Sequence, residues 1–486
     1  MSTFDFIICA IYLLLTLAIG VYSSLKHKQS NDEEYYLAGR TVGTFAIGIS
    51  VMATAFSAIN YLAIPTEIAS HGLYVIMAFP VFLLVTIPVV LYVIPFFCRL
   101  KQTSAYEFLE QRFDLKVRLL AGGLYIFWQL SLMALILVAS SKILFLLSGI
   151  PIPWLILILA VTAGGCAVIG GLKAVIWTDV LQFFVIAGSI ALILYMSVNG
   201  GNGDFISGAM SVGKLKPFIP FDPEVLSPDP TVRMTLWSVL LGTLMMFLSR
   251  YGADQSVIQR YAAAGSVSRA RRMFIWNISA ALFCLIMLAL FGIAMAHFAH
   301  NNGLDGKPGL IVMVKLLHQL PNGVNGLVVA GVLAAAMSSL DSGVNSIGVT
   351  WQRDFQHRLL SPGGNTIFHK MFESSIFVVI SILLAYVIFL FFKRHSIFVM
   401  TARTINALGS PLLVLVLAGM LPYKLRLRPS ALFWAGLCGI LFSVLFCLFI
   451  DNLAVHYYAV VNFVITVFFA LVFQFCFKIS SKRAEV

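Results

Sequence analysis

Charged residues are scarce in this chain. Asp, Glu, Lys and Arg make up 11% of its 486 residues, whereas a typical soluble protein carries about 25%. Hydrophobic residues make up 60%, and the mean hydropathy is +0.96. This composition excludes an ordinary soluble protein and predicts an integral membrane protein.

Catalytic motifs are missing as well. The chain has no Walker loop, no glycine-rich dinucleotide motif, no HExxH and no nucleophile elbow, which argues against an ATP-driven pump and the common membrane hydrolases. Its seven cysteines and nine histidines show no metal-ligand spacing. We therefore expect no catalytic residues and no prosthetic group, and an enzyme is the least favoured class.

Long apolar runs are abundant. Runs of about 20 residues match a bilayer-spanning helix, so the chain is predicted to be an all-α polytopic protein with the lipid bilayer as a partner. About thirteen spans are expected, near residues 4–25, 42–70, 73–98, 118–148, 150–169, 172–198, 233–262, 272–298, 324–352, 371–392, 396–422, 429–450 and 456–477. No small-residue cleavage site follows the first span, so no cleavable signal peptide is expected.

The net charge of +12 is divided unevenly between alternate loops. If the first span runs inward, most basic residues fall on one side, including a loop with Arg260, Arg269, Arg271 and Arg272. The positive-inside rule makes that side cytoplasmic. We expect a plasma (inner) membrane protein with its N-terminus outside and its C-terminus cytoplasmic. The basic charge then reports topology, and no nucleic-acid partner is expected.

Two spans have small or polar residues at mid-membrane, around 53–65 in the second and 242–255 in the seventh. The two spans are five apart in the order of spans, so the units that they begin run in opposite senses. Inverted-repeat transporters show this pattern and hold substrate at such broken helices.

The segment AAAMSSLDSGVNS (334–346) carries a polar strip inside an apolar span. At about 100° per residue its hydroxyl, amide and carboxylate groups share one arc of roughly 160°. Helix packing explains the glycines and some serines, but it does not explain Asp341. Because intramembrane ionisable groups are usually functional and oxygen donors suit a hard cation, the strip predicts a Na⁺ site.

Three further charged residues lie within spans. Asp179 is either an acid at a helix N-terminus or part of a cation site with Asp341. Arg250 and Arg403 are either snorkelling side chains or anion clamps, because a guanidinium can grip a carboxylate with two parallel hydrogen bonds. Arg250 is the deeper of the two and the better clamp candidate.

These motifs together resemble the sodium/solute symporter family over nearly the whole chain. The resemblance rests on YLAGR (36–40), TSAYEFLEQRF (103–113), GGLKAVIWTD (170–179), QSVIQRY (255–261) and the polar strip. Bacterial sialic acid transporters and animal sodium-coupled monocarboxylate and multivitamin transporters are the most similar branches. The resemblance implies an inverted-repeat fold of five plus five helices in a single transmembrane domain. Its parts are an extra N-terminal helix and inner loop (4–41), a first repeat (42–198), a second repeat (233–422) and two extra C-terminal helices (429–477).

The family pattern also implies ion and substrate positions. A Na⁺ site falls on Ala53, Phe56, Ala335, Ser338 and Ser339. A second Na⁺ site, as in sialic acid transporters, falls on Asp179, Ser338, Asp341 and Ser342; Asp341 stands where that pattern has serine. The pocket candidates are Ser57, Asn60, Tyr61, Phe79 and Arg250. Sialic acid itself is disfavoured, since Leu132 and Phe79 replace the arginine and glutamine of that pattern.

The function expected from these features is Na⁺-coupled symport of a small organic solute into the cell by alternating access. An organic anion such as a monocarboxylate is favoured because of Arg250. A proton-coupled symporter of the same fold and a solute sensor that does not concentrate its ligand are the alternatives. The oligomeric state stays open, a monomer included.

Overall fold

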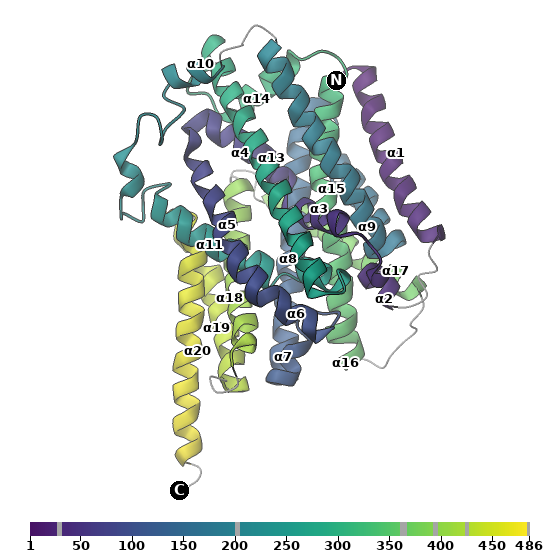
Figure 1. The fold of residues 1–486 in the computed structure, drawn as a ribbon, viewed down its shortest axis with the longest axis vertical. Helices are drawn as coiled ribbons and strands as arrows, with labels where there is room; N and C mark the ends of the chain where they lie inside the picture. Colours follow the sequence, from purple (N-terminus) through teal and green to yellow (C-terminus); the bar gives the residue numbers. More distant parts are fainter. Residues whose placement is uncertain (27–31, 200–204, 360–366, 392–396, 423–426, 484–486) are drawn as a thin grey trace.

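The structure, a computed structural model, describes residues 1–26, 32–199, 205–359, 367–391, 397–422 and 427–483. This part of the chain is a helical bundle without β-strands, and its termini lie at opposite ends (Figure 1). The helices of at least ten residues, besides those described in the next two paragraphs, are α1 Thr3–Lys26, α5 Phe79–Pro88, α8 Leu115–Ser148, α13 Val267–Asn301, α14 Gly309–His318, α15 Val324–Thr350, α17 Ile367–Phe391, α18 Ile397–Met420, α19 Pro429–Phe449 and α20 Tyr457–Arg483.

Two spans are broken where the sequence predicts it. Helices α3 (Thr44–Ala55) and α4 (Ala58–His71) are bent by 64°, and α11 (Leu236–Gly252) and α12 (Gln255–Ala263) by 51°. Ser57 at the first break has an extended backbone. At the second break the Asp254 side chain accepts a hydrogen bond from the Ser256 N–H and caps α12.

Helix α9 (Ile152–Asn199) contains two of the predicted spans. Its apolar part has 46 residues, and at 1.5 Å per residue it is about 69 Å long, more than twice the hydrocarbon thickness of a bilayer. The helical geometry breaks at Gly171, where φ is +58° and a Cβ atom would lie 2.7 Å from the Tyr35 carbonyl oxygen. With α9 counted as two crossings, ten long helices and two bent pairs supply the thirteen predicted spans.

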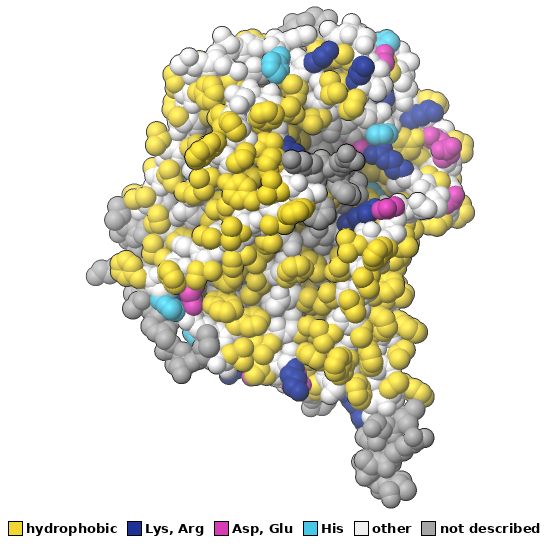
Figure 2. Space-filling model, turned by 180° about the vertical axis from the view of Figure 1, so that it is seen from behind, with side chains coloured by type: hydrophobic (Ala, Val, Ile, Leu, Met, Phe, Trp, Pro, Cys, Tyr) yellow, Lys and Arg dark blue, Asp and Glu magenta, His cyan; other side chains and the backbone are white. Residues whose placement is uncertain are grey.

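Burial separates a central helix from peripheral ones. In α15 94% of the most apolar window is buried, against 17% in α20 and 28% in α1 and α17. The exposed faces carry large apolar side chains, and Figure 2 shows them covering most of the side of the molecule. The polar strip of α15 therefore lies at the centre of the bundle, packed against α9 and α8, and lipid-facing helices surround it.

Candidate functional site

A cavity of about 280 Å³ lies at the two helix breaks. Residues of α3, α4, α5, α8, α11, α13, α15 and α18 line it, together with Val455 and His456 just before α20. The lining is mainly apolar, and its uncharged polar side chains are Thr54, Ser57, Asn60, Gln129, Thr243, Asn277, Ser339, Thr401, Asn406 and His456. The cavity is just below the usual size range of small-molecule sites and has their mixed character.

Four of the five predicted pocket residues, Ser57, Asn60, Phe79 and Arg250, line this cavity. The Ser57 hydroxyl donates to Asn60 Oδ1 over 3.2 Å. Tyr61 is not in the lining: it is fully buried, and its hydroxyl lies 2.9 Å from the Ser189 hydroxyl of α9. One residue turns a helix by about 100°, so the neighbours Asn60 and Tyr61 face different directions.

Arg250 connects the two breaks. One guanidinium nitrogen donates to Asp254 Oδ2 over 2.5 Å and another donates to the Thr54 carbonyl over 2.8 Å. The guanidinium therefore holds the end of α11 against the end of α3 and lies in the cavity wall. These two bonds use two of its five N–H donors.

The predicted serines of α15 meet the end of α3. The Ser338 hydroxyl donates to the Ala53 carbonyl over 3.0 Å and lies 3.1 Å from the Ala335 carbonyl. The Ser339 hydroxyl donates to the Thr54 carbonyl over 3.2 Å. We call the oxygens of Ala53, Thr54, Ala335, Ser338 and Ser339 the serine site.

Phe56, the remaining predicted position, ends α3, and its N–H donates to the Met52 carbonyl. The serine site is thus a set of neutral carbonyl and hydroxyl oxygens beside a helix end. Oxygen atoms of this kind are the ligands that a hard cation such as Na⁺ prefers, so the residues fit that ion.

The residues of the second predicted Na⁺ site divide between two surroundings. Asp179 Oδ2 accepts from the Ser50 hydroxyl at 2.5 Å and from Arg260 at 3.2 Å. The same guanidinium donates to the Ser342 hydroxyl over 2.7 Å. Asp341 instead accepts from the Thr178 hydroxyl at 3.3 Å and from the Ser342 N–H at 2.7 Å. Asp179 and Ser342 are joined through Arg260, whereas Asp341 is directed toward α9.

Arg260 is the main residue whose role the sequence did not reveal. Its assignment to a loop with Arg269, Arg271 and Arg272 is wrong: it is fully buried in α12 and contacts both Asp179 and Ser342. Arg260 occurs in the QSVIQRY segment, which identified the family. Asp179 and Asp341 are buried carboxylates that need a nearby positive charge. This requirement was the signal in the sequence that could have identified Arg260 as their neighbour.

Arg403 lies outside the cavity lining. It donates to Asp451 Oδ1 over 2.6 Å and to the Cys447 carbonyl over 3.1 Å, and its guanidinium carbon lies 5.4 Å from the centre of the Tyr458 ring. These contacts join α18 to α19, to the segment that follows α19 and to α20, so Arg403 has a packing role.

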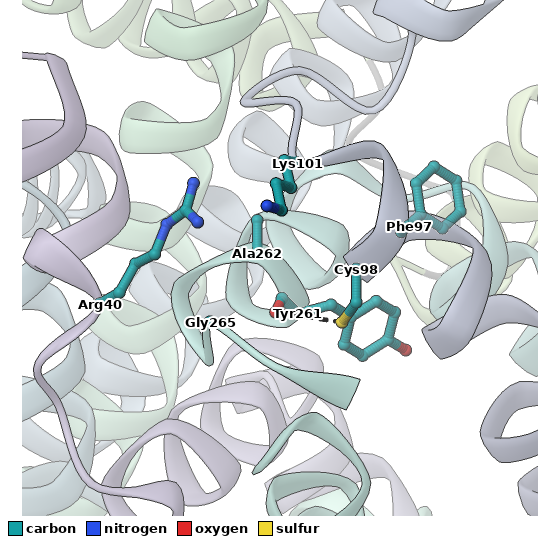
Figure 3. Close-up of a pocket in the computed structure, with 7 residues that line it drawn as sticks. All are labelled: Arg40, Phe97, Cys98, Lys101, Tyr261, Ala262 and Gly265. Atoms are coloured by element: carbon teal, nitrogen blue, oxygen red, sulfur yellow. Dashed lines mark hydrogen bonds between the residues drawn. The ribbon is translucent and has the colours of Figure 1, made fainter. Parts of the chain in front are cut away.

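A second, much smaller cavity of about 10 Å³ lies between Arg40, Lys101 and Tyr261 (Figure 3). It has room for about one water molecule. Arg40 also pairs with Glu33 at 3.0 Å. This cavity is too small for an organic solute.

His456 contributes a pH-sensitive group to the cavity wall. Burial, with Arg233 nearby, lowers the pKa of His456 to about 4. The folded protein therefore keeps this imidazole neutral at pH values where an unfolded chain, with a pKa near 6.5, is protonated.

We expect the stability that depends on neutral His456 to be complete above about pH 6.5 and to fall as the pH drops toward 4. The melting temperature of the purified protein should therefore fall less between pH 7 and pH 5 in His456→Gln than in the wild type. The matched control is His318→Gln, since His318 is exposed on α14. Equal pH slopes in the wild type and His456→Gln contradict the prediction.

Two broken helices that enclose a cavity, with a group of neutral carbonyl and hydroxyl oxygens at one break, define a helical membrane transporter of the inverted-repeat class. The sequence profile of the sodium:solute symporter family matches residues 35–439. The chain belongs to the sodium:solute symporter family. It is therefore a transporter and not an enzyme, and Na⁺ is the coupling ion.

Curated relatives agree with this family. The chain is 32% identical over 359 residues to the sodium/sialic acid symporter SiaT of Proteus mirabilis, a match that covers 72% of this chain and 70% of the relative. It is 32% identical over 369 residues to the sodium-dependent multivitamin transporter of Oryctolagus cuniculus, covering 73% of this chain but 56% of that longer protein. It is 27% identical over 363 residues to human sodium-coupled monocarboxylate transporter 1, covering 72% and 58%.

Solved structures share the fold. The substrate-bound, outward-open structure of a Na⁺-coupled sialic acid symporter matches with a TM-score of 0.85 and 25% identity, covering 97% of this chain and 98% of that one. The nucleobase-cation-symport transporter Mhp1 matches with a TM-score of 0.59 at 12% identity, covering 93% and 96%. The second likeness concerns the fold alone.

Proposed function

We propose that the protein imports a small organic anion, such as a monocarboxylate, together with Na⁺ by alternating access. The solute occupies the cavity at the two breaks, and Na⁺ occupies the serine site. The two repeats are residues 42–198 and 233–422, and the N-terminus lies outside a plasma membrane whose inner side carries the C-terminus. Curated relatives whose names include sialic acid and monocarboxylate support an acidic solute.

One observation carries the proposal: the Thr54 carbonyl belongs to both sites. It accepts a hydrogen bond from Ser339 in the serine site and another from Arg250 in the cavity wall. A Na⁺ ion that draws this carbonyl into its coordination shell changes the partner of Arg250. The guanidinium is then free to share its donors with a solute carboxylate, so each ligand favours the conformation that the other needs.

Arg250 supplies the test of the solute class. In a thermal-shift screen of small acids with the purified protein, acids that stabilise it in Na⁺ but not in choline identify candidate solutes. Arg250→Gln should weaken the binding of such an acid by at least about tenfold, because it removes a charge-assisted, two-pronged contact worth about 1.5–3 kcal/mol.

The matched control is Arg403→Gln, which also removes an arginine from a membrane helix but lies outside the cavity. Arg250→Gln protein that keeps the wild-type response to a carboxylate would refute the anion clamp. In proteoliposomes, uptake that survives replacement of Na⁺ by choline at fixed pH favours proton coupling. Failure to accumulate solute above the outside concentration favours a sensor.

A further inference from the structure

The cavity at the two breaks changes character along its length. On α11 it is lined first by Thr243, then by Met246 and Phe247, and then by Arg250, and spacings of three and four residues place these side chains on one helix face. At 1.5 Å per residue, Thr243 and Arg250 are about 10 Å apart along the helix axis. The ring centre of Phe247 lies 4.0 Å from that of Phe82 on α5, which also lines the cavity. The wall thus runs from a hydroxyl through aromatic rings to a guanidinium.

The chain just before α20 closes the cavity at the Thr243 end. Gly242 of α11 packs so closely on the His456 carbonyl oxygen that a Cβ atom has no room there. The same segment is held by Asn406 of α18, whose amide nitrogen donates to the Val455 carbonyl over 3.2 Å. Thr243, Asn406 and His456 all line the cavity. The end away from Arg250 is therefore built by α11, by α18 and by the segment that joins the two extra C-terminal helices.

Two polar atoms at this end lack a partner. Asn406 is 5% exposed, and its amide oxygen has no hydrogen-bond donor among the described residues. The bond from the amide nitrogen to Val455 fixes which way the amide faces, so the group without a partner is the acceptor. His456 Nδ1 is also buried without a partner in the described part of the chain. Because a buried acceptor without a donor is costly, a ligand that donates to Asn406 is favoured here.

We propose that Thr243, Asn406 and His456 form a head-group subsite, which selects solutes with an O–H or N–H donor at the end away from their carboxylate. The preferred solute is then a carboxylic acid with a stem of several carbon atoms and a hydroxyl, amide or urea head group. The apolar middle of the cavity suits such a stem, and the guanidinium of Arg250 suits the carboxylate.

This inference rests on the proposed function, because it places the carboxylate at Arg250. It adds a length and a second polar group to the solute, since a short acid does not reach both ends of the cavity. It also gives the extra C-terminal helices a part in specificity, although they lie outside the two proposed repeats. The donor preference itself depends on Asn406 and does not require a charged solute.

The test compares matched pairs of compounds on the purified full-length protein in Na⁺. Each pair is an ω-hydroxyalkanoate and the alkanoate in which a methyl group replaces the hydroxyl, with chains of increasing length, and dissociation constants are measured by titration calorimetry. At the best chain length the wild type should bind the hydroxy acid at least about tenfold more tightly than its methyl partner. Asn406→Leu should reduce this ratio to about one and leave the affinity for the methyl partner near the wild-type value.

The matched control is Asn462→Leu. Asn462 on α20 is also buried with an unpartnered amide oxygen, and it donates to the Asn406 carbonyl, but it does not line the cavity. Its variant should keep the preference for the hydroxy acid. If Asn406→Leu does not fold, Thr243→Val gives the decision, because it removes one hydroxyl at nearly constant volume and should lower the ratio about threefold.

The outcomes separate this inference from the anion clamp. Equal binding of both members of every pair by the wild type, or an unchanged ratio in Asn406→Leu and Thr243→Val, overturns the head-group subsite. If Arg250→Gln then still weakens all the acids, the proposed function stands. A second set of pairs has a primary amide in place of the carboxylate. A hydroxyl preference that persists in these pairs and disappears in Asn406→Leu supports the subsite, even where insensitivity to Arg250→Gln refutes the clamp.

Discussion

Replacement of Ser338 and Ser339 with alanine together is expected to lower Na⁺-dependent uptake by about 30- to 150-fold at limiting Na⁺. The two hydroxyls provide two oxygens of the serine site, and each net hydrogen bond or ligand of this kind contributes about 1–1.5 kcal/mol, so the loss of both weakens Na⁺ binding roughly 30- to 150-fold. Uptake of an acid identified by thermal shift, measured in proteoliposomes with an inward Na⁺ gradient, provides the readout.

The matched control for this double variant is another pair of adjacent buried serines. Ser140 and Ser141 on α8 are fully buried, and neither hydroxyl has a hydrogen-bond partner within the described chain. Ser140→Ala with Ser141→Ala should leave Na⁺-dependent uptake near the wild-type level. Normal uptake by the Ser338/Ser339 variant, with unchanged Na⁺ dependence, would show that the serine site is not the coupling site.

Arg260→Met is expected to destabilise the folded protein strongly. It leaves Asp179 as a buried carboxylate without its ion-pair partner and costs about 3–5 kcal/mol. It also removes the donors to Ser50 and Ser342 that join α12 to α3 and α15. The measurement is thermal unfolding of the purified protein, followed by size-exclusion chromatography.

Two further variants show whether the lost positive charge causes the destabilisation of Arg260→Met. Asp179→Asn in the Arg260→Met background removes the carboxylate that lost its partner, so it should recover part of the lost stability. Arg271→Met is the control, because Arg271 is partly exposed and donates to the Val90 carbonyl. A stable Arg260→Met protein, or a double variant no more stable than Arg260→Met, contradicts the expected role of the ion pair.

The membrane fold follows closely from the sequence because hydropathy is a local property. A run of about 20 apolar residues must form a helix in a bilayer, where unpaired backbone groups are too costly. The breaks near residues 56 and 253 could be placed for the same reason, since small and polar residues interrupt the apolar pattern there. The two spans predicted at 150–169 and 172–198 are separated only by a kink at Gly171, whose positive φ and close approach to the Tyr35 carbonyl leave no room for a Cβ atom.

The candidate sites were predictable only in part. Ser338, Ser339 and Asp341 stand out because polar groups in an apolar span are rare and costly. Tyr61 appeared equivalent to Asn60 in the sequence, yet the helix turns its hydroxyl toward Ser189 on α9. The pairing of Arg250 with both Asp254 and Thr54 also needed the bend between α11 and α12.

The sequence by itself determined that this protein is a helical membrane transporter with two broken spans and a polar strip on a central helix, because hydropathy and helical periodicity act over neighbouring residues. Only the tertiary structure decided which buried acidic side chain pairs with which buried basic side chain. Arg260, in a segment that was assigned to a loop, is buried against Asp179 on another helix, so Asp341 is left with hydrogen bonds from the Thr178 hydroxyl and the Ser342 N–H. Electrostatic pairing depends on distances between helices far apart in the chain, and no local pattern encodes those distances.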